Sequence, residues 1–365
     1  MLLARLGSLN ALEQTAGKRG VWSRLLGKGQ HVPSADTLAR VQTLLDPEDL
    51  RDLLHEQYAR LKRRKALPAP YHGLLALVID GHESIASYRR CCAGCLTREI
   101  QTKSGSKTQY YHRDAVAMLI GEGFEILLDL EPQRAGENEV GAALRLLQRV
   151  HARYPRAFDV VVADALYAQT PFFREVLALG KDVMAVLKQE NKALLRDARA
   201  LCEIVPAREM VAGSTHRRCW DLADLSWAKF ERTVRVVRSE ETTRIRRQLT
   251  KQVEEISSTW WWVTTLTQER APLQAVVDLG HRRWAIENEG FNEGVNAWHM
   301  DHVYRHEPRA MEVVLLLMML AYNLLHVFYA RNLKPLLRRR FSLQHIGRET
   351  AAELYAAASP ARAPP

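Results

Sequence analysis

The stretch LLALVID, from Leu74 to Asp80, decides how the chain is interpreted. It is a continuous run of aliphatic residues that ends in an aspartate. Such runs are typical of strands that are buried on both faces of a sheet. A second stretch, FDVVVAD from Phe158 to Asp164, repeats the pattern. The sequence therefore predicts two buried strands, each ending in an aspartate.

Three further strands are predicted around these two. TQYYHRDAVAMLI (108–120) and FEILLDLE (124–131) are separated by a glycine-containing turn, and DVMAVLK (182–188) forms the fifth strand. An amphipathic helix is expected over 139–154 and a short helix near 171–179. The order β-β-β-α-β-α-β predicts an α/β fold with a mixed five-stranded sheet flanked by helices.

The regions on either side of this sheet differ in pattern. The N-terminal region carries apolar residues at helical spacing, with Ser34 as a candidate N-cap, and ends near Pro68 and Pro70. The segment after the fifth strand alternates strand-like pieces with arginines and then returns through TWWWVTTL (259–266). The expected domains are a helical region at 1–70, a core at 71–189 and 259–335, an inserted, mostly β domain at 190–258, and a basic then Ala/Pro-rich tail at 336–365.

Composition narrows the class of protein. The 365 residues are 47% hydrophobic, which is enough for a folded core. Lys and Arg number 52 against 42 Asp and Glu, and the net charge of +10 favours a polyanionic partner such as nucleic acid. Five irregularly spaced cysteines argue against a secreted disulfide framework. The apolar run Val313–Tyr322 is shorter than the about 20 residues that span a bilayer, so we expect no membrane association and a cytoplasmic protein.

Asp80 and Asp164 are the first candidates for chemistry. Ligands gather at the carboxyl ends of strands in open α/β sheets. Buried carboxylates are costly unless they are paired or bind metal, and magnesium prefers oxygen ligands. The alternative is that each aspartate caps a turn, since Asp80-Gly81 is a common turn pair. Phosphoryl transfer by two metal ions needs carboxylates from several elements. Asp80 and Asp164 supply two, so a third carboxylate must come from another part of the chain.

HRRWAIENEGFN, from His281 to Asn292, offers that carboxylate. As a helix it places Arg283 and Glu287 four residues apart, on one face. An apolar stripe that includes Trp284 and Phe291 is expected to dock this helix on the sheet.

At this point a family resemblance becomes visible. ALVIDG, VVVADALYAQ and HRRWAIENEGFN, in this order, resemble the three catalytic blocks of the DDE transposases of bacterial insertion sequences. The branch with a β-rich insertion before the glutamate has a last block of the form Tyr-x2-Arg-x3-Glu-x6-Lys. Arg283 and Glu287 match it, whereas Gly280 and Gly294 occupy the tyrosine and lysine positions.

The resemblance implies a ribonuclease-H-like core and a transposase that cuts insertion-sequence ends and joins them to target DNA. Asp80, Asp164 and Glu287 would bind two Mg²⁺ or Mn²⁺ ions. Arg283 would contact a DNA phosphate or orient the glutamate, and the small residues nearby would leave room for the DNA backbone. Other residues expected at the site are Arg282 and His281, which would bind phosphate, and Tyr167 and Asn288, which would contact the metal ligands.

The implied partners are double-stranded DNA, as terminal repeats and target, and a second copy of the chain in a paired-end complex. The protein would be associated with the nucleoid. Two alternatives stay open: a metal-dependent nuclease of the same fold without strand transfer, and a catalytically inactive, DNA-binding transposase remnant.

A zinc site is not expected from the sequence. Cys92-x2-Cys95 and His112 could supply three ligands, but a structural site needs four, and no second pair lies at the usual spacing. The later histidines, which include His306, are expected to cap helices or contact phosphate.

Overall fold

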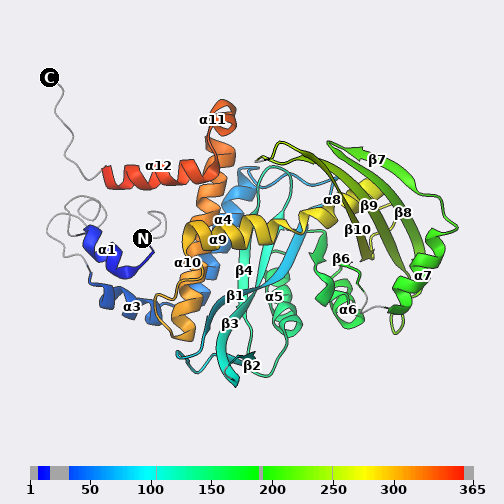
Figure 1. Ribbon diagram of the computed structural model, residues 1–365. Helices are drawn as coiled ribbons and strands as arrows, with labels where there is room; N and C mark the ends of the chain where they lie inside the picture. The colour runs from blue at the N-terminus through cyan, green and yellow to red at the C-terminus, as the bar shows by residue number, and fades with distance from the viewer. Residues whose placement is uncertain (1–6, 17–32, 104, 189–191, 249, 357–365) are drawn as a thin grey trace. The chain divides into compact units, whose positions relative to one another are not determined.

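The computed structural model describes residues 7–16, 33–103, 105–188, 192–248 and 250–356. The chain divides into two compact units (Figure 1). Unit 1 comprises Met1–Pro68, Gly81–Arg153 and Ala285–Pro365, and unit 2 comprises Ala69–Asp80 and Tyr154–Trp284. Each unit has its own buried apolar residues.

Unit 2 is built on three parallel strands. β1 (Ala76–Ser87), β5 (Val160–Ala163) and β6 (Asp182–Val186) lie side by side with β5 in the middle. The apolar runs of these strands are almost fully buried, as continuous apolar strands of a covered parallel sheet should be. The helices α6 (Thr170–Ala178) and α8 (Leu273–Arg282) contact β6. These elements confirm the strands predicted near 74–80, 158–164 and 182–188 and the short helix predicted near 171–179.

The strand β1 does not end at Asp80, where its apolar run ends. It continues to Ser87 with partly exposed, alternating positions, and from Gly81 onward it belongs to unit 1. The predicted strand end at Asp80 is therefore wrong, and the Asp-Gly pair is not a turn. The apolar run marks where burial on both faces stops, whereas the backbone hydrogen bonds of the strand continue.

The segment after β6 adds four antiparallel strands to the sheet of unit 2. Its strands pair consecutively, and β10 also pairs with β6, with Trp262 opposite Val186. The order within unit 2 is therefore β1-β5-β6-β10-β9-β8-β7. The elements of this segment are α7 (Lys192–Cys202), β7 (Arg208–Ala212), β8 (Thr215–Leu225), β9 (Val234–Arg246) and β10 (Val253–Thr264).

Two predicted details of this segment change. The strand-like pieces expected at 233–241 and from 243 onward are joined in one strand, β9, which ends at Arg246. The predicted return strand at 259–266 is the second half of β10, which begins at Val253. The strands of the β-rich segment thus continue the mixed sheet of unit 2, because β10 pairs with β9 along its length and with β6 at its end.

Unit 1 contains an antiparallel sheet covered by helices. β2 (Leu96–Thr102) pairs with β3 (Gly105–Ile120), and β3 pairs with β4 (Ile126–Pro132) and neighbours β1. The helix α5 (Glu139–Arg153) packs on β3 and β4. β3, β4 and α5 were predicted. β2 was not, because its residues alternate exposed and half-buried positions and include three charged or amide side chains.

A long helix organises the rest of unit 1. α10 (Pro308–Val327) contacts α3 (Ala35–Leu44), α4 (Pro47–Arg63) and β4, and Figure 1 shows it in orange beside the blue α4. Ser34 caps α3, as predicted, by accepting a hydrogen bond from the Thr37 amide. The other elements are α1 (Leu9–Ala16), η3 (Ile286–Phe291), α9 (Asn292–Trp298), η4 (Phe328–Asn332), α11 (Pro335–Arg340) and α12 (Leu343–Ala356).

The continuous helical segment Pro308–Asn332 is, by length and composition, apolar enough to cross a membrane. However, 61% of its apolar window is buried inside the fold. This share is what a core helix shows, and it agrees with the expectation of a buried helix.

Candidate active site

Two aspartates follow the paired stretches of neighbouring strands in unit 2. β1 and β5 are parallel, with Val78 opposite Val162. Asp80 lies two residues beyond Val78 on β1, and Asp164 lies two residues beyond Val162, directly after the end of β5. The Asp164 backbone is still extended (φ −78°, ψ −173°). Neighbouring strands lie about 4.8 Å apart. The fold therefore places the two aspartates that the sequence singled out at the same end of two paired stretches.

Asp80 is held by an arginine. Its side chain is 13% exposed, and Oδ2 lies 3.4 Å from Nη1 of Arg283. Arg283 is only 4% exposed, and its guanidinium lies 4.3 Å from the centre of the Trp284 ring. Arg283 was expected at a DNA phosphate or at Glu287, and within unit 2 its guanidinium lies beside Asp80. Trp284 was expected in the buried stripe, but it is 36% exposed.

Asp164 has a different environment. Its carboxylate accepts a hydrogen bond of 2.8 Å from the Leu166 amide and so caps η1 (Ala165–Tyr167). It also lines an open cavity of about 1060 Å³. Lys188, at the end of the predicted fifth strand, lines the same cavity and was not singled out from the sequence. Tyr167, which was, is fully buried against Phe172, so its ring is a core side chain.

Glu287 lies in unit 1, on the π-helix η3. Single turns of π-helix are rare in proteins, and those that occur are often found at functional sites. Three contacts fix η3 within unit 1. The Phe291 ring stacks on His82 at 4.7 Å, Tyr322 Oη donates to the Glu289 carbonyl, and Gly290 packs against Met118. Glu287 is therefore carried by a well-packed segment and is itself half-buried.

Asn288, the neighbour of Glu287, is exposed. It lines a separate cavity of about 430 Å³ in unit 1, whose other polar residues include Asn292, Asn296 and Arg348. The structure therefore gives Asn288 polar neighbours of its own within unit 1.

Side chains of the fold occupy the space beside two glycines that lie near Glu287 in the sequence. A Cβ on Gly280 would lie 2.4 Å from the Trp262 ring, and a Cβ on Gly294 would lie 2.7 Å from the Met300 sulfur. The expectation that these small residues leave room for the DNA backbone is therefore wrong at both positions. At Gly280, where the resemblance expects tyrosine, the indole of Trp262 occupies the space.

The two residues before Arg283 were expected to bind phosphate. His281 Nε2 lies 2.7 Å from Glu241 Oε1, and its ring lies edge-on to Trp260 and Trp262. His281 is thus engaged within unit 2. Arg282 is half-buried and also has partners in the fold.

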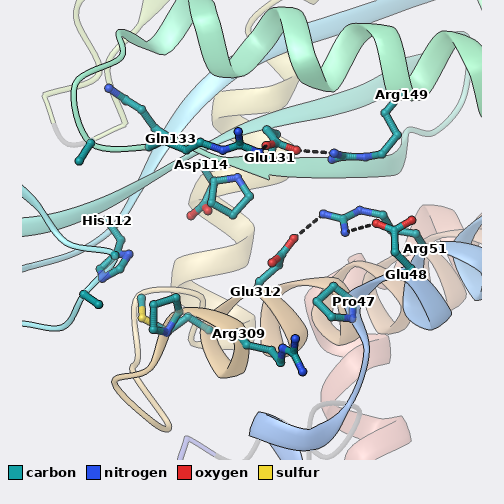
Figure 2. Close-up of a pocket in the computed structure, with 17 residues that line it drawn as sticks. Pro47, Glu48, Arg51, His112, Asp114, Glu131, Gln133, Arg149, Arg309 and Glu312 are labelled. Atoms are coloured by element: carbon teal, nitrogen blue, oxygen red, sulfur yellow. Dashed lines mark hydrogen bonds and ion pairs between the residues drawn. The ribbon is translucent and has the colours of Figure 1, made fainter.

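A second group of carboxylates lines a cavity of about 600 Å³ in unit 1 (Figure 2). Figure 2 shows Arg51 and Arg149 reaching the carboxylates of Glu312 and Glu131. A further carboxylate, Asp114, is buried, and this burial raises its pKa to about 7. These carboxylates lie outside the three sequence blocks that carry Asp80, Asp164 and Glu287, and those three residues remain the candidates for the chemistry.

Comparison with known proteins shows the family of the chain. No curated protein matches the sequence significantly. The family model described as Transposase DDE domain matches residues 78–324, which include Asp80, Asp164 and Glu287. The match covers more than half of the chain, and the chain therefore belongs to the transposase DDE-domain family.

Proposed function

We propose that this transposase cuts the ends of an insertion sequence and joins them to target DNA by metal-dependent phosphoryl transfer. Asp80, Asp164 and Glu287 are the proposed metal ligands and catalytic residues. The observation that supports the proposal is the parallel pairing of β1 with β5, since Asp80 and Asp164 each lie two residues beyond the Val78–Val162 pair. The family match, which spans all three carboxylates, supports it.

The donor set fits a divalent cation. Proteins of this family generally use divalent metal ions. Carboxylate oxygens are the ligands that Mg²⁺ and Mn²⁺ prefer, and Asp80 and Asp164, which follow the paired stretches of β1 and β5, supply them. Bound as a pair, such ions activate the attacking oxygen and stabilise the leaving oxygen.

The residues of the chain have distinct proposed roles. Arg283 holds the Asp80 carboxylate in position until metal binds, since its guanidinium is buried between that carboxylate and the Trp284 ring. Lys188, on the cavity that Asp164 lines, contacts a DNA phosphate. Glu287 completes the ligand set from η3. The net charge of +10 favours DNA as the partner.

Transposition requires both ends of the element to be held together, so we propose a homodimer that binds two terminal repeats and then target DNA. The substrate places the protein in the cytoplasm, at the nucleoid.

The test is a cleavage and joining assay with element ends, target DNA and Mg²⁺. Asp80→Asn and Asp164→Asn are each expected to lower both rates about 1,000-fold or more, since a missing metal ligand removes several kcal/mol of transition-state stabilisation. The matched control is Asp224→Asn, because Asp224 is an exposed unit 2 residue with positive φ, which asparagine tolerates. DNA binding of the variants, measured by gel shift, confirms that they are folded. An Asp80→Asn protein that still cuts element ends and joins them to target DNA would contradict the proposal.

The same assay separates the two alternatives. A nuclease would cleave the ends but would not transfer a pre-cleaved end with a free 3′-hydroxyl. An inactive remnant would bind DNA without Mg²⁺-dependent cleavage. The filled space at Gly280 removes one reason for proposing a remnant, because the glycine there is matched by a bulky neighbour instead of leaving a void.

A further inference from the structure

Four side chains of the metal-binding kind converge in unit 1, on residues that the transposase chemistry does not use. They are Cys92 and Cys95 from the loop between β1 and β2, His112 on β3, and His306 just before α10. One ligand atom from each residue lies within 4.8 Å of all the others. The set is hidden in the sequence because its fourth member, His306, follows Cys95 by 211 residues.

The distances within this Cys/His cluster suit a single tetrahedral ion. The two sulfurs are 3.7 Å apart. His112 Nε2 lies 3.2 Å from Cys92 Sγ and 3.3 Å from Cys95 Sγ, and His306 Nε2 lies 3.5 Å from Cys95 Sγ. Zinc bonds of about 2.3 Å to sulfur and about 2.0–2.1 Å to nitrogen place two sulfurs about 3.8 Å apart and a sulfur and a nitrogen about 3.6 Å apart.

The local backbone supports the arrangement. Cys95 N donates to the Cys92 carbonyl at 3.1 Å, which closes the turn, and Cys92 N donates to Cys95 Sγ at 3.2 Å. Gly94 lets this turn approach the start of α10, since a Cβ there would lie 2.8 Å from Pro308 Cγ. The cluster is thus built by close packing of three chain segments that are distant in sequence.

We propose that Cys92, Cys95, His112 and His306 bind one structural zinc ion. Two thiolates and two imidazoles at tetrahedral spacing select zinc over harder cations. Four protein ligands leave no open position, which is the pattern of structural rather than catalytic zinc. The proposal goes beyond the transposase function and does not depend on it.

The two thiols of the cluster are not joined in a disulfide, so both sulfurs can bind a metal ion.

Zinc at this position would have a defined structural role. It would tie the β1–β2 loop and β3 to the segment that links α9 to α10. Pro308, the first residue of α10, and His112 also line the cavity of Figure 2, so the ion would close one wall of that cavity. The expected consequence of metal loss is a less stable unit 1.

The first experiment measures zinc in the full-length protein. Protein purified in metal-depleted buffer is expected to contain about one zinc ion per chain, as measured by inductively coupled plasma mass spectrometry. A strong chelator should remove the zinc and lower Tm. Cobalt added in its place should give thiolate-to-metal absorption in the near ultraviolet. Protein without zinc whose Tm does not respond to added zinc or to chelator overturns the proposal.

Variants then locate the site. Cys92→Ser and His306→Gln should lower the bound zinc at least about tenfold, since each removes one of four ligands. The matched controls are Cys91→Ser, next to the cluster, and His302→Gln, in the same segment as His306. Both should keep the full zinc content, and loss of zinc in either control contradicts the assignment. Asp80→Asn should also keep its zinc, which separates this site from the proposed catalytic one.

Should the cluster variants fail to fold, alkylation of the wild-type protein gives the same answer. Cys92 and Cys95 should react slowly with iodoacetamide, and quickly once a chelator is added, while Cys91 reacts alike in both conditions. Equal reactivity of Cys92 and Cys95 with and without chelator overturns the proposal.

Discussion

The two units assemble their candidate ligands in opposite ways. In unit 2, Asp80 and Asp164 each follow a buried apolar run, and the two runs pair as parallel strands. In unit 1, the Cys/His cluster joins a loop, a strand and a segment more than two hundred residues later. Strand register is readable from short sequence patterns, whereas packing between remote segments is not. Local patterns therefore reveal the first site and hide the second.

A substitution of Glu287 tests whether unit 2 alone supplies the catalytic ligands. Glu287→Gln is expected to lower cleavage and joining about 1,000-fold or more, because the proposed ligand set loses its third carboxylate. Zinc content and Tm should stay unchanged. The matched control is Glu289→Gln, two residues along the same π-helix, which should retain activity. If Glu287→Gln kept full activity, unit 1 would supply no catalytic ligand. The proposed set would then be reduced to Asp80 and Asp164 of unit 2.

The rigid packing of unit 2 can be probed at Gly280. Gly280→Ala places a Cβ against the Trp262 indole, a rigid ring that is 1% exposed. We expect the free energy of unfolding to fall by about 1–3 kcal/mol, the usual range for overpacking. Urea denaturation measures the change. In a Trp262→Leu background the same alanine should cost clearly less, and an equal cost in both backgrounds would show that the ring is not the cause.

Gly294 provides the flexible counterpart in unit 1. A Cβ there meets the sulfur of Met300, the movable part of an adaptable side chain. Alanine also favours a helix by about 1 kcal/mol over glycine. Gly294→Ala is therefore expected to change the free energy of unfolding by less than about 1 kcal/mol, in either direction. A loss as large as that of Gly280→Ala would remove the contrast between rigid and adaptable packing.

Much of the fold is predictable from the sequence. The five core strands, the helix at 139–153 and the N-cap at Ser34 follow from apolar periodicity and capping chemistry. β2 escapes prediction because a half-exposed edge strand has no continuous apolar run. The end of β1 is misjudged for a related reason, since burial and backbone pairing stop at different residues.

The candidate site is predictable in part. Asp80 and Asp164 are recognised because each carboxylate directly follows a continuous apolar run that is visible in the sequence. The roles of Arg283 and His281 are not, because their partners, Asp80 and Glu241, lie on other strands. Tyr167 shows the same limit, since only the fold reveals that its ring is enclosed.

The fit between Gly280 and the Trp262 ring has a consequence for evolution. A bulky residue at position 280 requires a smaller one at position 262. A substitution at 280 that comes first therefore costs more stability than a substitution at 262 that comes first. A lineage that gains tyrosine at 280 must first shorten the side chain at 262. Among relatives of this transposase, the two positions should therefore covary, with one large aromatic residue shared between them.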